Sequence, residues 1–297
     1  MTFCGPILIG NIWSGQSKVL PDGSGVLAQS SDVTSAPKSG LGLRILSALV
    51  MAPVAIAAVW FGSPWFGLLI LVFSIAMIWE WMRMCAPDRA LLLAGISGLG
   101  LAISMYMQSV APTLAGLLPA LIAAIITVLA CGRERALVLT GAVFIPVAAL
   151  AVQWLRAWHA DGLLLIMWLF LTVWATDTGA YAFGRAIGGP KLAPRFSPKK
   201  TWAGLFGGMI CAALIGGLMV YFSGGSSIAA IALTSAALAV VAQIGDLAES
   251  ALKRRFGVKD SSNLIPGHGG FLDRADGMLS VLPVAFVIVY FFGLTLH

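Results

Sequence analysis

The sequence predicts an all-α integral membrane protein with about nine transmembrane helices. Of its 297 residues, 59% are hydrophobic and only 10% are charged, whereas a soluble domain carries roughly 25% charged residues. The apolar residues occur in long runs of Leu, Ala, Ile and Val without the alternation of barrel strands, and a single segment satisfies its own backbone in lipid only as a helix. Since no stretch could build a separate aqueous core, we expect one polytopic unit.

Nine apolar segments are long enough to form these helices. A hydrocarbon core about 30 Å thick requires about 20 residues of helix, and we expect spans at 44–62, 64–83, 90–108, 111–130, 136–155, 162–184, 201–222, 228–252 and 275–296. Prolines inside spans should kink their helices, because proline removes a backbone donor; these are Pro53, Pro119, Pro146 and Pro283. Residues 41–160 hold five spans, and 161–297 hold four spans, two long polar loops and the expected catalytic residues.

The first forty residues differ from the rest of the chain. Residues 1–40 begin with a short apolar patch, lack the basic start of a secretory signal and continue as a Ser- and Gly-rich polar sequence. We expect this segment to be disordered and cytoplasmic. The four cysteines lie far apart in the sequence, which argues against a zinc site or a disulfide framework.

The basic residues predict the orientation of the spans. With a cytoplasmic N-terminus and nine crossings, every Lys and Arg except Arg156 falls on the cytoplasmic side, as the positive-inside rule requires. A wrong number of spans would scatter these charges over both faces. The net charge of +6 therefore reports topology and does not require a nucleic-acid partner. The two long loops, 185–200 and 253–274, lie on this same face.

The end of the eighth span carries a polar helix face. Gln243, Asp246, Ser250, Lys253 and Arg254 recur at helical spacing. A carboxylate at membrane depth costs roughly 3 kcal/mol on insertion scales and is usually functional. The alternative is an ion pair from Asp246 to Lys253 or Arg254 that closes the helix end.

Two further acids begin the ninth span. Asp273 and Asp276 lie at i and i+3 on one helix face, and capping of the helix N-terminus accounts readily for only one of them. Together with Asp246 they flank one polar loop, so the three could converge as hard oxygen ligands for Mg²⁺. Asp177 is a fourth, intramembrane candidate, for which helix packing is an equal alternative.

Cations and hydroxyls precede the seventh span. We expect Ser197, Lys199, Lys200 and Thr201 to open this helix, where two ammonium groups at the positive end of the dipole suit an anion. The alternative is positive-inside anchoring, which needs the lysines but neither hydroxyl. Downstream, the glycine-rich run 266–270 could present backbone amides to a phosphate.

Other polar and glycine residues receive structural interpretations. His268 could stabilise its own turn, and a zinc role is not expected because no second histidine lies nearby. Glu80, between Trp79 and Trp81, is expected to be an interfacial residue. The glycines of the seventh span suit close helix approach.

Residues 250–276 resemble the signature of the phosphatidate cytidylyltransferase, or CDP-diacylglycerol synthase, family. The residues at the family's spacing are Ser250, Lys253, Arg254, Lys259, Asp260, Pro266, His268, Gly269, Gly270, Asp273, Arg274 and Asp276. Segments 245–249, 197–202 and 177–184 are also similar to family motifs, so the resemblance covers about 170–296. Ala203 replaces a usual acidic residue and Ala275 a larger apolar one, but neither departure removes a candidate metal ligand.

The resemblance implies that CTP and phosphatidate give CDP-diacylglycerol and pyrophosphate at a bacterial inner membrane, with a divalent metal required. We assign Asp246 and Asp273 as leading Mg²⁺ ligands and Asp276 and Asp177 as supporting acids. The residues expected to act in catalysis are Asp246, Asp273, Lys253 and Arg274. Those expected to bind substrate are Ser197, Lys199, Lys200, Thr201, Ser250, Arg254, Lys259, Asp260, His268, Gly269 and Gly270. A homodimer is compatible with the resemblance and with the glycine-rich seventh span.

Two other functions use similar residues. A CTP-dependent kinase of a membrane lipid alcohol would also need metal, basic loops and helix-end acids, but it would transfer the γ-phosphate and release CDP. A cation or proton transporter would use Asp177 and Asp246 as intramembrane carriers. A transporter predicts acids spread through the bilayer, whereas half of the twelve acids here gather in or beside the two long loops.

Overall fold

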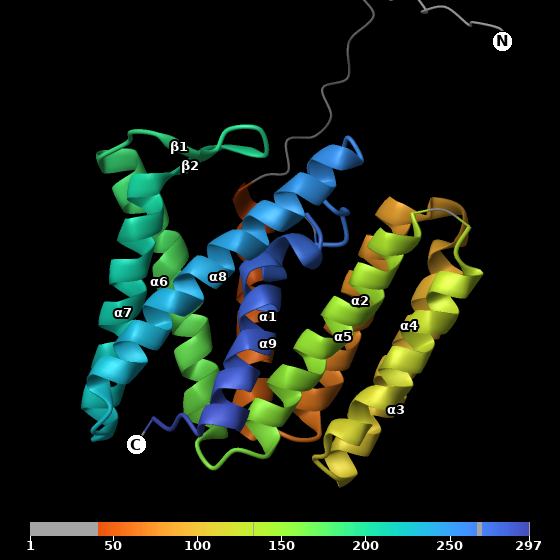
Figure 1. Cartoon of the computed structure of the whole chain (residues 1–297), viewed down its shortest axis with the longest axis horizontal. Coiled ribbons are helices and arrows are strands. Elements are labelled where there is room, and N and C mark those ends of the chain that lie inside the picture. The colour runs from red at the N-terminus through yellow and green to blue at the C-terminus, as the bar shows by residue number, and fades with distance from the viewer. Residues whose placement is uncertain (1–40, 133, 266–268, 297) are drawn as a thin grey trace, which may run out of the picture. The chain divides into compact units, whose positions relative to one another are not determined.

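The computed structural model describes residues 41–132, 134–265 and 269–296 (Figure 1). These ranges hold nine α-helices: α1 (Leu41–Phe61), α2 (Trp65–Cys85), α3 (Ala90–Val110), α4 (Leu118–Ala130), α5 (Arg135–Ala157), α6 (Gly162–Ala186), α7 (Trp202–Ser223), α8 (Ile228–Arg255) and α9 (Leu272–Phe292). They also hold the 3₁₀ helices η1 (Pro87–Arg89) and η2 (Leu114–Leu117) and the strands β1 (Lys191–Ala193) and β2 (Ser197–Thr201). The predicted disorder of 1–40 falls outside the described residues, as does His268.

The prediction of an all-α, multi-pass membrane protein is confirmed. Seven helical segments in the described ranges are long and apolar enough to cross a membrane. The segment Leu114–Ala130 is shorter than this length, so the predicted span 111–130 is wrong at its start. Ala111 leaves α3 in an extended conformation, which is the bias of a residue before proline. Pro119 lies in the first turn of α4, where its missing donor costs nothing, and not in a helix interior as expected.

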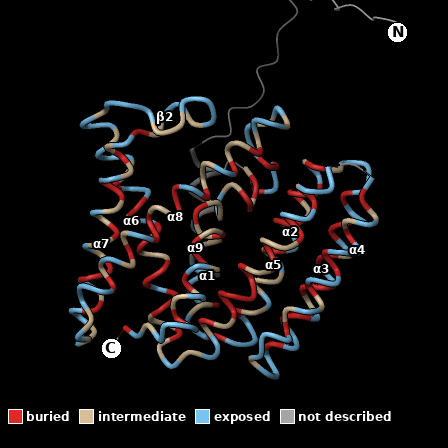
Figure 2. Tube along the Cα trace, viewed as in Figure 1, coloured by how far each residue is buried: buried red, intermediate tan, exposed pale blue. Residues whose placement is uncertain are grey.

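The helices bury one face and leave large apolar side chains outside. Figure 2 shows buried positions (red) concentrated where helices face one another, with exposed positions (pale blue) on the outer faces. Trp168 on α6 is completely buried, and its Nε1 donates to Ser235 Oγ on α8 at 2.8 Å. Exposed apolar side chains such as Phe206, Ile210 and Leu214 on α7 suit contact with lipid.

The connections between helices gather at two ends. At one end, uppermost in Figure 1, Arg89 Nη1 donates to Ala130 O at 2.6 Å and Arg255 pairs with Glu134 at 2.8 Å. At the other end, Arg156 Nε donates to Val59 O at 2.8 Å. Arg156, the one basic residue expected on the far side of the membrane, therefore lies at the end opposite the loops with the other charges.

A β-hairpin replaces part of the expected polar loop before the seventh helix. β1 pairs antiparallel with β2, with Lys191 opposite Thr201 and Ala193 opposite Ser197. The helix begins at Trp202, beside the predicted start of the span at 201, and residues 197–200 precede it as a strand. Ser197 precedes Pro198, and such a residue favours extended backbone. Only Thr201 joins the helix, as the cap whose Oγ1 accepts from Gly204 N at 3.1 Å. The lysines consequently lie on a strand.

Close approach of α6 and α7 confirms the packing role predicted for glycine. A Cβ built on Gly207 would lie 2.3 Å from Phe183 Cβ, and one on Gly208 would lie 2.9 Å from Thr176 O. Both distances are below those that real Cβ atoms show. The glycines therefore allow α7, which begins directly after β2, to lie against the helix that carries Asp177.

Candidate active site

Asp246 forms an ion pair with the hairpin. Lys200 Nζ on β2 lies 2.8 Å from Asp246 Oδ2 on α8, and both side chains are largely withdrawn from solvent, at 23% and 14% exposure. The intrahelical ion pair from Asp246 to Lys253 or Arg254 is therefore not formed. Lys200 and Asp246, two residues of the predicted site that are 46 residues apart in the sequence, are therefore in direct contact.

Two more carboxylates approach Asp246. Asp276 on α9 and Asp177 on α6 both interact electrostatically with it. Glycines permit the approach of α8 to α9, since a Cβ on Gly277 would lie 3.0 Å from Asp246 Oδ1 and one on Gly245 would lie 2.9 Å from Asp276 O. Three acids from three helices thus interact around Asp246, and Lys200 is the cation that acts on Asp246 and Asp177. Like charges so arranged favour an additional cation.

A cavity adjoins this ion pair. It has a volume of about 200 Å³ and lies between α6, α7, α8 and β2. The predicted residues that line it are Asp177, Lys199, Lys200, Thr201 and Asp246. Gln243, from the polar face of α8, also lines the cavity. Cationic and carboxylate groups on one cavity wall are what a metal-bound phosphate requires.

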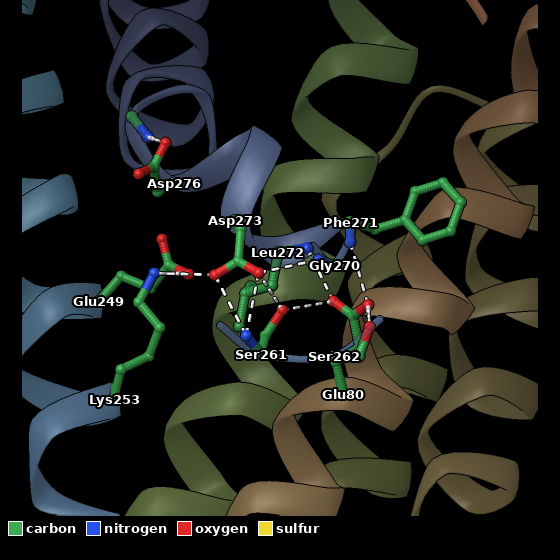
Figure 3. Close-up of polar contacts among 11 residues, drawn as sticks. Glu80, Glu249, Lys253, Ser261, Ser262, Gly270, Phe271, Leu272, Asp273 and Asp276 are labelled. Carbon is green, nitrogen blue, oxygen red and sulfur yellow. Dashed lines mark hydrogen bonds and ion pairs between the residues drawn. The ribbon is translucent and has the colours of Figure 1, made fainter. Parts of the chain in front are cut away.

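Asp273 lies in a different neighbourhood from Asp246. Its Oδ1 accepts from Lys253 Nζ at 2.8 Å, and Lys253 also pairs with Glu249 at 3.1 Å. Its Oδ2 accepts from the backbone N–H of Gly270 at 2.8 Å and of Ser261 at 2.9 Å (Figure 3). Both oxygens are therefore engaged, as expected for an acid in the first turn of a helix. The two predicted leading ligands do not share one set of neighbours.

Glu80 is a polar residue of this region whose role the sequence analysis missed. The expectation of an interfacial position is wrong, because Glu80 on α2 is completely buried. It accepts hydrogen bonds from the backbone N–H of Phe271 at 3.0 Å and of Leu272 at 2.8 Å, and from the hydroxyls of Ser261 and Ser262. A carboxylate inside a predicted span was the available signal.

Most of the other predicted residues are exposed or half-buried. The exposed ones are Lys199, Arg254, Lys259, Asp260 and Arg274, and the half-buried ones are Ser197 and Ser250. Gly269 has a φ of +86°, which favours glycine. Gly270 is buried, and its amide already donates to Asp273. Contacts of these residues with a substrate stay predictions.

The donor set fits a divalent cation that substrate completes. In the described part of the chain, no group of three or more His, Cys, Asp or Glu side chains is placed to hold a metal ion alone. Mg²⁺ usually takes only one or two protein carboxylates together with substrate phosphates and water. Asp246 and Asp276 offer such oxygens, and Glu249 Oε2 is buried without a hydrogen-bond partner among the described residues.

Membrane-length helices with acids and lysines gathered at one end define the class: a multi-pass membrane protein with a site suited to phosphates. A sequence profile of the cytidylyltransferase family matches residues 42–292, and the chain belongs to this family. A phosphatidate cytidylyltransferase of Brucella suis biovar 1 (strain 1330) is 40% identical over 262 residues, which cover 86% of this chain and 94% of the relative. These matches confirm the family resemblance.

Two further relatives are more similar in identity, but over shorter stretches. Phosphatidate cytidylyltransferases of Staphylococcus haemolyticus (strain JCSC1435) and Haemophilus influenzae (strain ATCC 51907 / DSM 11121 / KW20 / Rd) are each 46% identical. The first match covers 45% of this chain and 52% of the relative, and the second covers 45% and 48%. All three relatives are bacterial proteins.

Proposed function

We propose that this protein transfers the cytidylyl group of CTP to phosphatidate, giving CDP-diacylglycerol and pyrophosphate for phospholipid biosynthesis. The observation that carries the proposal is the cavity beside the Lys200–Asp246 pair, at one end of lipid-length helices, in a chain of the cytidylyltransferase family. A site at a helix end suits both substrates. The acyl chains stay in the bilayer while the nucleotide enters from water.

The reaction joins two anions. An oxygen of the phosphatidate phosphate attacks the α-phosphorus of CTP, and the bond from that phosphorus to the bridging oxygen of the β-phosphate breaks as pyrophosphate leaves. Phosphate monoesters have a second pKa of about 6, so the attacking group is largely dianionic and needs little help from a general base. The site must instead reduce charge repulsion and hold the groups in line.

The cations around the cavity serve this purpose. Lys199 and Lys200 face the space between α6 and α8, where they meet the phosphates of the nucleotide. Lys253 lies between Asp273 and Glu249, and we assign it to the triphosphate or the leaving pyrophosphate. Arg274, exposed at the start of α9, is assigned to the phosphatidate headgroup or the pyrophosphate.

Mg²⁺ is the proposed cofactor, and it would neutralise charge on the transferring phosphate. Asp246 and Asp273 are its assigned ligands, with Asp276 and Asp177 as supporting acids. The hard oxygen donors and the excess of acids over lysines around Asp246 support this assignment for Asp246, Asp276 and Asp177. The assignment of Asp273 rests on the family resemblance. Asp273 first has to exchange its bond to Lys253, which an arriving triphosphate favours because it offers that ammonium group a more charged partner.

The protein is proposed to lie in a bacterial inner membrane with the hairpin end cytoplasmic. The concentration of basic residues at that end supports the orientation through the positive-inside rule. A homodimer is also proposed, and the exposed apolar face of α7 offers a surface for it. Cross-linking in native membranes tests the dimer.

The first test is lipid labelling by purified protein in detergent. CTP labelled at the α-phosphate is supplied with phosphatidate and Mg²⁺, to wild type and to Asp246→Asn and Asp273→Asn. We expect label in lipid for wild type and a loss of about 100-fold or more in both variants, as for other groups that act on transition-state charge. Asp88→Asn, which changes an exposed carboxylate on η1, serves as the control and should retain activity.

Other outcomes point to other functions. Unlabelled lipid together with labelled CDP that forms only with a lipid alcohol would establish the kinase instead. CTP left intact under all conditions would contradict both transfer reactions and favour a transporter.

A further inference from the structure

Glu80 connects α2 to a segment far along the chain. Its carboxylate accepts from Leu272 N, 192 residues away, at 2.8 Å and from Phe271 N at 3.0 Å. Ser262 Oγ donates to the same group. Figure 3 shows these bonds converging on Glu80 from Leu272, the first residue of α9, and from residues that precede this helix. A buried carboxylate is costly unless hydrogen bonds satisfy it, and here they do.

The contacts fix the beginning of α9. The first N–H groups of a helix have no partner within the helix, and a local Ser, Thr, Asp or Asn side chain usually caps them. Phe271 stands at the cap position and provides no side-chain cap. Glu80 supplies the acceptor from another helix, so the start of α9 is tied in position and direction to α2.

The same group is linked to Asp273. Ser261 Oγ lies 3.1 Å from Glu80 Oε2 and 2.9 Å from Asp273 Oδ2. Gly270 is packed against Glu80 and Ser261, since a Cβ on it would lie 2.5 Å from Glu80 Oε1 and 2.0 Å from Ser261 Oγ. Asp273 in turn holds Lys253 at 2.8 Å. A continuous chain of contacts therefore runs from Glu80 to two assigned catalytic residues.

We infer that Glu80 is a positioning residue for cytidylyl transfer, which sets the place of Asp273 and, through it, of Lys253 without touching substrate. The inference rests on the proposed function for its catalytic meaning. Ser261, which touches both carboxylates, is the connecting element. Loss of the Glu80 charge should let the segment before α9 shift and move both catalytic side chains.

The test combines Glu80→Gln with equilibrium binding of CTP and lipid labelling, in the full-length protein in detergent. A glutamine has one acceptor oxygen, so at least one of the N–H groups of Phe271 and Leu272 loses its partner. We expect CTP affinity and kcat each to fall by about 10- to 100-fold, the range for groups that orient metal-site residues. Binding isotherms give the CTP affinity and the number of competent sites separately. A purely structural defect would lower the number of sites and leave the affinity unchanged.

Ser97→Ala is the matched control. Ser97 Oγ and Thr127 Oγ1 form a buried hydrogen bond of 2.9 Å between α3 and α4, so its loss lowers stability away from α9. CTP affinity and kcat per competent site should stay at wild-type values. If Glu80→Gln behaves in the same way, with fewer sites of unchanged affinity and kcat, Glu80 is only a structural cap and the inference is overturned.

A second variant covers the case in which Glu80→Gln does not fold. Ser261→Ala removes only the hydroxyl between Glu80 and Asp273, and it should weaken CTP affinity and kcat in the same direction. Wild-type values in Ser261→Ala would contradict the inference. Failure of the proposed function is distinguishable, because then wild type itself labels no lipid.

Discussion

At the scale of single residues, the site consists of charges that balance each other in pairs drawn from different elements. Lys200 on β2 meets Asp246 on α8, and Lys253 on α8 meets Asp273 on α9. Partly buried ion pairs contribute little net stability as pairs, but removal of one partner leaves an uncompensated charge. The stability and the activity of this site should therefore respond differently to substitution.

Lys200→Met tests this separation. It leaves Asp246 without its lysine, and we expect the free energy of unfolding to fall by about 1–3 kcal/mol. Lys200→Met combined with Asp246→Asn removes both charges and should recover most of that loss, while both variants lack activity. Thermal unfolding in detergent measures stability. Lys199→Met, at an exposed position on the same strand, should leave the unfolding temperature unchanged. Equal decreases of the unfolding temperature in all three variants would contradict this prediction.

At the scale of elements, glycines decide which helices approach closely enough to bring the acids together. Gly207 and Gly208 seat α7 against α6, and Gly245 and Gly277 seat α8 against α9. The hairpin β1–β2 then places its lysines over the helix ends. Neither a longer side chain at these crossings nor a continuous helix through 197–201 would produce the same cavity.

Gly207→Ala should damage this arrangement. Its Cβ would lie 2.3 Å from Phe183 Cβ, and overpacking of this kind costs about 1–3 kcal/mol. We expect a lower unfolding temperature and reduced lipid labelling, because α6 carries Asp177 and α7 follows Lys200. Gly217→Ala on the same helix is the control, since its Cβ would meet Ile228 Cγ2 at an ordinary 3.5 Å. Indistinguishable unfolding temperatures for the two variants would show that the crossing is tolerant.

At the scale of the whole molecule, charge is distributed unevenly between the two ends of the helices. Arg156 binds Val59 O and Trp60 O at one end. Arg89, Arg255 and the hairpin lysines lie at the other. This asymmetry is the physical basis of the proposed orientation.

Labelling of single cysteines in a variant without the native ones tests the orientation. Asn263 and Ser226 are both exposed, the first in the segment after α8 and the second in the turn before it. A membrane-impermeant maleimide should react with Asn263→Cys only in inverted vesicles and with Ser226→Cys only in intact cells with a permeable outer membrane. Reaction of both from one side would contradict the crossing of α8.

The sequence by itself determined the fold class and the approximate limits of most helices, and it predicted the charged residues that line the cavity beside Asp246. These features follow from local physics, because a run of about 20 apolar residues can satisfy its backbone in lipid only as a helix. Acids near helix ends stand out in such a chain because their burial is costly. The family signature at 250–276 added the reaction, which the family match supports.

Only the tertiary structure decided which charges meet. Asp246 pairs with Lys200, 46 residues away, and not with the lysine and arginine of its own helix. Glu80 is buried against a segment 191 residues away, although its sequence neighbours suggested an interface. Such pairings depend on how glycines and turns set helices against one another, and side-chain spacing along one helix carries no information about partners on another.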